Sequence, residues 1–156
     1  MMIDEKSRAA AHATLTAYLN TQKMRRTPER FAILDKALDM PDHFTIDSLW
    51  EALTADNYLV SRATVYSTLK LLCESCIVRR HNFEGRVSCY EKAITPTVNH
   101  QHLICTECGK VREVRDPELM RLLESRRYST FHPGYFAIYA YGICNRCAKR
   151  RRKKLP

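Results

Sequence analysis

Apolar residues recur at helical spacing through the first half of the chain. Leu15 and Leu19 fall on one face of a helix that the pattern predicts in residues 1–22. A second helix is predicted from Pro28, with Thr27 as its N-cap, because Pro is favoured at the first helical position and Thr is a good cap. The first quarter of the chain is therefore expected to be helical.

Two more capped helices are predicted, one starting at Thr45 and one spanning residues 61–74, which starts at Ser61. Each carries an apolar stripe, for example Val65 and Leu69 in the latter. Short helices joined by tight links are typical of a helix-turn-helix core.

The spacing of apolar residues changes after this helix. Residues 77–80 and 86–90 are predicted to be short strands, with a turn at 83–85. Helices followed by such a hairpin make a winged helix. Residues 93–99, which contain Pro96, are predicted to be a linker.

The last third follows a different pattern. Strands are predicted in residues 102–104 and 111–114, a helix in 117–128 and a strand in 136–141. The strands are apolar on both sides, which fits burial against a second copy of the chain. The expected fold class is α+β, with a winged helix at 1–92, a hinge at 93–99, a small α/β domain at 100–148 and a basic tail at 149–156.

Charge is distributed unevenly along the chain. The net charge is +9, yet residues 1–93 carry 13 basic and 12 acidic side chains, whereas residues 94–156 carry 13 and 5. Six positive charges lie in 149–154, a tail expected to be disordered and solvated, with non-specific attraction to phosphates. No apolar run approaches the roughly 20 residues of a membrane helix, and no secretion signal is found, so a cytoplasmic protein without a membrane partner is expected.

Two Cys-x-x-Cys pairs, Cys105 with Cys108 and Cys144 with Cys147, predict a closed, tetrahedral Zn²⁺ site that contributes to folding. A disulfide framework or unconnected core cysteines are the alternatives. Reduced thiols are favoured in a chain without a secretion signal. The remaining cysteines are interpreted as small core or surface residues; they are Cys73, Cys76 and Cys89.

His100 and His102 form a His-x-His pattern just before the first cysteine. Alternate residues of a strand face the same side, so both imidazoles can reach one ion. Two ordinary surface histidines are the alternative.

Taken together, these stretches resemble the ferric uptake regulator family of bacterial metal-responsive repressors. The similarity runs in order over nearly the whole chain and is carried by residues 25–30 (RRTPER), 43–45 (HFT), 49–50 (LW), 61–66 (SRATVY), 81–85 (HNFEG), 90–91 (YE), 100–105 (HQHLIC), 108–110 (CGK), 141–142 (YG), Cys144 and Cys147.

The resemblance implies a homodimer that binds double-stranded operator DNA through its winged helix and dimerises through its C-terminal domain. It also implies a regulatory site for Fe²⁺, Mn²⁺ or Zn²⁺. The family's ligands fall on His43, Glu91, His100, His102 and Glu113. Because these residues come from both domains and the hinge, a shared ion would fix the angle between the domains and the spacing of the two recognition helices.

The candidate DNA contacts are Arg25, Arg30, Arg62, Thr64, Tyr66 and Ser67. Arg25 matches a basic residue that enters the minor groove in relatives, and Arg62 at the helix start can reach a phosphate; plain solvation is the alternative for each surface arginine. Tyr66 can contact a thymine methyl group, and Thr64 can bind a phosphate. Relatives commonly carry Arg where this chain has Ser67, so a different operator sequence is expected.

A further metal site of many relatives is expected to be absent, because its positions hold Gln101, Met120 and Phe136, and His132 lies four residues away from the required place. Two other classes remain open: a metalloenzyme, and a zinc-stabilised interaction module. No His-Glu-x-x-His, nucleophile motif or phosphate loop is found, so no catalytic residue and no small-molecule substrate are expected. Peroxide and haem remain alternative signals.

Overall fold

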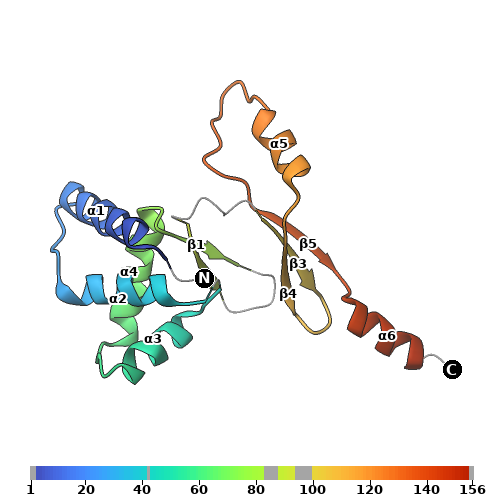
Figure 1. The fold of residues 1–156 in the computed structure, drawn as a ribbon, viewed down its shortest axis with the longest axis horizontal. Helices are drawn as coiled ribbons and strands as arrows, with labels where there is room; N and C mark the ends of the chain where they lie inside the picture. The colour runs from blue at the N-terminus through green and yellow to red at the C-terminus, as the bar shows by residue number, and fades with distance from the viewer. Residues whose placement is uncertain (1–2, 42, 83–87, 94–99, 155–156) are drawn as a thin grey trace. The chain divides into compact units, whose positions relative to one another are not determined.

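A computed structural model of the chain describes residues 3–41, 43–82, 88–93 and 100–154. The chain divides into two compact units, Met1–Thr95 and Pro96–Pro156. Within these described residues, the first unit has four helices and a hairpin, and the second has a three-stranded sheet and two helices (Figure 1). The fold class is α+β, as the sequence predicted. In the described residues, no helix has the length and apolar character needed to cross a membrane.

The first unit contains the four predicted helices, with ends close to the expected positions. They are α1 (Glu5–Thr21), α2 (Pro28–Asp39), α3 (Ile46–Ala55) and α4 (Arg62–Glu74).

Local hydrogen bonds explain why these helices begin where they do. Thr45 and Ser48 form a reciprocal capping box on α3, and the Ser61 hydroxyl accepts a 3.0 Å hydrogen bond from the Thr64 amide at the start of α4. At α2 the start is set by Pro28, since Thr27 makes no capping side-chain hydrogen bond within the described part of the chain.

The apolar stripes of the four helices meet in one core. Its fully buried members include Leu15, Leu19, Leu34, Leu49 and Leu69. Burying each such side chain contributes about 1.5–3 kcal/mol, so this core is the main source of the unit's stability.

The predicted hairpin consists of β1 (Val78–His81) and β2 (Cys89–Lys92), paired antiparallel with Arg79 opposite Glu91. The turn predicted at 83–85 lies outside the described residues. The hairpin is extended by an isolated bridge, in which the backbones of Phe44 and Tyr90 exchange hydrogen bonds of 3.0 and 2.7 Å. This bridge ties the loop before α3 to β2.

The second unit is built on a sheet in the order β4-β3-β5. β3 (Gln101–Cys105) pairs antiparallel with β4 (Val111–Val114) and parallel with β5 (Ile138–Gly142). α5 (Pro117–Ser125) follows β4, and α6 (Asn145–Lys154) follows β5.

Three sequence predictions are wrong in this unit. The helix from Pro117 ends at Ser125 and not at residue 128, because Arg126 leaves the helix with ψ of 137°. The last strand begins at Ile138 and not at Phe136, since pairing with β3 starts there.

The third correction concerns the basic tail. Residues 149–154 were expected to be disordered, but they form the greater part of α6. The helix is started by the second cysteine pair, whose Cys144 carbonyl accepts a 2.9 Å hydrogen bond from the Ala148 amide. An ion pair between Arg151 and Glu107 adds a contact farther along. These contacts oppose the repulsion between neighbouring positive charges.

Candidate metal centres

The four paired cysteines come together because β3 and β5 are parallel neighbours. Cys105 ends β3 and lies opposite Gly142, the last residue of β5. Cys144 lies two residues after the end of β5, and Cys108 and Cys147 complete the two knuckles. Gly109 has φ of 65°, the left-handed conformation that lets the chain turn back into β4 after the first pair.

The four sulfur atoms are arranged as a tetrahedral metal requires. All lie within 4.8 Å of one another, and Cys108 Sγ and Cys144 Sγ are 3.8 Å apart. Zn–S bonds of about 2.3 Å in a tetrahedron place sulfur atoms about 3.8 Å apart. A disulfide needs about 2.05 Å, and all four thiols are free, so the disulfide alternative is wrong.

Hydrogen bonds and burial change the pKa values of the cysteine thiols in this cluster. Backbone amides of Cys108 and Cys144 point at Cys105 Sγ and lower the pKa of that thiol to about 6. Burial raises the pKa of Cys147 to about 12. The Arg150 guanidinium donates to Cys147 Sγ at 3.3 Å. A divalent cation is therefore needed to ionise the whole set, which includes the buried Cys147 thiol.

The three other cysteines take no part in this cluster. Cys73 and Cys89 are half-buried and Cys76 is exposed. Burial raises the pKa of Cys73 to about 11, which makes it a poor nucleophile. The interpretation as small core or surface residues is confirmed.

The first unit brings two of the predicted regulatory ligands together. His43 Nε2 lies 3.4 Å from Glu91 Oε2, and the Glu91 side chain is only 5% exposed. The Phe44–Tyr90 bridge fixes the residues next to both ligands in the chain. A buried carboxylate beside an imidazole is a typical half of a divalent-metal site.

Sequence reasoning missed three residues that surround Glu91 and its strand. His81 is 3% exposed, with Nε2 3.0 Å from Glu91 Oε1, and Arg79 lies 3.9 Å from the same oxygen. Lys92 is 8% exposed and donates to the carbonyl oxygens of Met40 and Leu38 at 2.7 and 3.3 Å. The available signal was strand alternation, which places residues 79 and 81 on one face.

The second unit gathers the other three predicted ligands. Nε2 atoms of His100 and His102 lie 3.2 Å apart, and Glu113 Oε2 is 4.0 Å from His100 Nε2. His102 is 2% exposed and sits opposite Glu113 in the register of β3 and β4. The alternative of two surface histidines is wrong for His102.

Two positions of the further family site, Gln101 and Met120, are buried in this structure. Gln101 is buried, and its Oε1 accepts a 2.9 Å hydrogen bond from the Asp116 amide, just before α5. Met120 is buried, Phe136 is half-buried and His132 is exposed. The absence of an additional ion at these residues stays a prediction.

The expected DNA contacts of α4 are mostly at the surface. Tyr66 is 53% exposed, and Thr64 is half-buried. Arg62 is exposed but pairs with Asp47 at 2.8 Å and lies over the Trp50 ring. The Ser67 hydroxyl donates to the Thr64 carbonyl at 3.0 Å. Asp47 and Trp50 therefore hold the Arg62 guanidinium at the start of α4.

Two further arginines precede or begin α2. Arg25 is exposed and Arg30 is half-buried. Arg30 donates a hydrogen bond to the Arg25 carbonyl, so it holds the shape of the segment that presents Arg25.

Comparison with known proteins identifies the family. The sequence profile of the ferric uptake regulator family matches residues 21–133. The chain belongs to the ferric uptake regulator family. The family consists of metal-responsive transcriptional regulators, which is the function that the sequence predicted.

Relatives of this family member respond to different signals. The chain is 30% identical to the peroxide-responsive repressor PerR of Staphylococcus aureus, over 84% of this chain and 87% of the relative. The crystal structure of the Vibrio cholerae ferric uptake regulator is 30% identical, with a TM-score of 0.60 over 81% of this chain and 96% of that one. The Pseudomonas aeruginosa regulator, solved with manganese, is 26% identical, with a TM-score of 0.70 over 83% and 97%.

Proposed function

We propose that this regulator is a homodimer that binds operator DNA when one divalent ion, Fe²⁺, Mn²⁺ or Zn²⁺, is held by His43, Glu91, His100, His102 and Glu113. The observation that carries the proposal is that each unit holds an incomplete ligand set. The first unit contributes one imidazole and one carboxylate at 3.4 Å. The second contributes two imidazoles 3.2 Å apart and a carboxylate.

Neither set alone satisfies a transition metal that prefers four to six ligands. Bound to both sets, the ion supplies a link between the units. The fold positions each ligand set before the ion binds. The Phe44–Tyr90 bridge fixes His43 next to Glu91, and β3–β4 pairing fixes His102 next to Glu113. Such preorganisation lowers the entropy lost on binding.

The link between the units matters because the two winged helices of a dimer must be spaced to fit the helical repeat of DNA. Successive major grooves on one face of the duplex lie about 34–36 Å apart, so the spacing of the two α4 helices decides affinity. By linkage, DNA then tightens metal binding by the same factor as metal tightens DNA binding.

In this proposal α4 enters the major groove. Tyr66 supplies apolar contact to bases, Thr64 and Arg62 bind phosphates, and Arg25, supported by Arg30, contacts the DNA backbone or the minor groove. Ser67 is too short for the bidentate contact to guanine that Arg makes, which changes the operator preference. Binding to chromosomal DNA would place the protein in the cytoplasm.

The Cys105, Cys108, Cys144 and Cys147 cluster is proposed to hold structural Zn²⁺. Its four ligands close the coordination sphere and leave no position for substrate. This zinc joins the ends of β3 and β5 to α6, and it is separate from the regulatory ion.

The test is DNA affinity by fluorescence anisotropy, with a promoter-derived duplex, under anaerobic conditions. The zinc-loaded protein is titrated with chelator present, and then with Fe²⁺, Mn²⁺ or added Zn²⁺. A rise of about tenfold or more, equivalent to about 1.4 kcal/mol of coupling, supports the proposal and identifies the ion. Equal affinity under all conditions contradicts it. Loss of the Fe²⁺ response after peroxide treatment would indicate a peroxide sensor.

A further inference from the structure

The last helix concentrates positive charge to an unusual degree. α6 contains seven basic residues among ten and no acidic residue. The buried Cys147 lies in its first turn, so the metal cluster holds the start of the helix in place. These basic residues therefore belong to an anchored helix and not to a free tail.

Some of these charges are already balanced. Arg146 hydrogen-bonds Cys108, Arg150 donates to Cys147, and Arg151 pairs with Glu107. Four thiolates around Zn²⁺ carry a net charge of about −2, which Arg146 and Arg150 offset. Lys149 and Arg152 are exposed, and no ion pair is formed by either within the described ranges.

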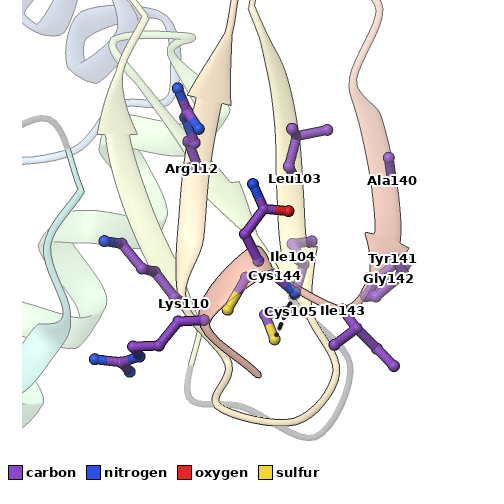
Figure 2. A pocket seen from close by; sticks show the side chains of 12 residues that line it. Leu103, Ile104, Cys105, Lys110, Arg112, Ala140, Tyr141, Gly142, Ile143 and Cys144 are labelled. Atoms are coloured by element: carbon purple, nitrogen blue, oxygen red, sulfur yellow. Dashed lines mark hydrogen bonds between the residues drawn. The ribbon is translucent and has the colours of Figure 1, made fainter. Parts of the chain in front are cut away.

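Further cations lie on β4. Lys110 and Arg112 are both exposed and line one cavity of about 540 Å³ together with Arg146 of α6. Figure 2 shows Lys110 and Arg112 on the β4 side of this cavity, with Leu103 on the neighbouring strand. Strand alternation points Arg112 away from the face of Glu113, so that carboxylate does not neutralise it.

Lys110, Arg112, Lys149 and Arg152 are called the basic patch below. We propose that the basic patch binds the phosphate backbone of duplex DNA without reading its sequence. This inference rests on the proposed DNA-binding function and adds a second contact surface to it.

Charge balance favours this assignment. Residues 1–93, which include α4, carry a net charge near +1, whereas residues 94–156 carry about +8, or about +6 when four thiolates hold Zn²⁺. Non-specific affinity comes from neutralising phosphates with Lys and Arg, so the unit with the excess charge must supply most of it. Insertion into a lipid surface is disfavoured, because α6 contains no large apolar side chain.

The expected effect is a change in salt dependence. Each phosphate contact contributes about 0.9 to the slope of log affinity against log salt. We therefore compare how much affinity each protein loses when salt rises from about 50 to about 200 mM. The wild-type protein, with four such contacts, should lose about 150-fold more affinity than a variant that lacks them.

The experiment uses the full-length, zinc-loaded protein and a random-sequence duplex, without added regulatory metal. The test variant replaces the basic patch with glutamine (K110Q, R112Q, K149Q, R152Q). The matched control removes the same charge from exposed arginines elsewhere in the unit (R115Q, R121Q, R126Q, R127Q). Zinc content and far-UV circular dichroism establish that both variants are folded.

We expect the magnitude of the slope to fall by about 3 to 4 in the patch variant and by less than about 1 in the control. Equal falls in both variants, or none in either, overturn the inference. The inference is also overturned if the patch variant no longer binds anionic vesicles but still binds the duplex as the wild-type protein does. Metal-dependent binding to the promoter duplex is measured separately, so failure of the metal switch is distinguished from failure of the patch.

Discussion

His81 Nε2 lies 3.0 Å from Glu91 Oε1, whereas His43 Nε2 lies 3.4 Å from the other carboxylate oxygen, Oε2. The two oxygens of Glu91 therefore face different partners. Oε1 lies near His81 and Arg79 of β1, and we propose that Oε2, next to His43, binds the regulatory ion. We therefore propose that His81 positions Glu91 as a metal ligand.

Replacing His81 with leucine is expected to weaken binding of the regulatory ion by about 10- to 100-fold, the usual effect of removing a residue that orients a metal ligand. The measurement is metal affinity by competition with a chromogenic chelator. His132→Leu is the matched control, because His132 is exposed. Unchanged affinity in the His81 variant would remove it from the site.

Lys92 is expected to stabilise the first unit through α2. Its ammonium group is buried against the Met40 and Leu38 carbonyls, and Lys92→Met leaves these acceptors without their donor. The free energy of unfolding should fall by about 1–3 kcal/mol in urea denaturation. Lys70→Met, at an exposed position, should change it by less than about 0.5 kcal/mol. Similar losses in both variants would contradict the role of Lys92.

Zinc removal is expected to unfold α6. The helix carries neighbouring like charges, and its contacts run through Cys144, Cys147 and Glu107. Cys147→Ser should lose bound zinc and lower the far-UV helical signal, whereas Cys76→Ser, at an exposed thiol, should keep both. A zinc-free protein with full helical content would show that α6 forms on its own.

Ser67 is expected to set the operator preference. Ser67→Arg adds a long donor to the exposed side of α4 and should gain about 1–3 kcal/mol of discrimination for guanine at one position of each half-site. Selection from a randomised duplex library, performed with both proteins, measures this directly. Identical selected sequences would place residue 67 away from the bases.

The sequence could predict the helices of the first unit because their signals are local. Apolar spacing and the caps at Thr45 and Ser61 depend only on neighbouring residues, and both were correct. The cysteine cluster was predictable for a similar reason, since two short motifs specify it.

Features that depend on pairing between distant strands were harder to predict. The position of Ile138 as the first residue of β5 follows from its register with β3, which no local pattern encodes. His81 was missed because its contact with Glu91 depends on the β1–β2 register. Residues 149–154 were misjudged because a run of like charges opposes helix formation unless tertiary contacts compensate.

The most direct test of the proposed switch is a double-mutant cycle between His43 in the first unit and His102 in the second. Metal-dependent DNA affinity is measured for the wild-type protein, His43→Ala, His102→Ala and the double variant. If both imidazoles bind one ion, each single change should abolish most of the tenfold or greater metal response, and the double change should cost little more. Independent, additive losses, or a full metal response in either single variant, would contradict a shared ion.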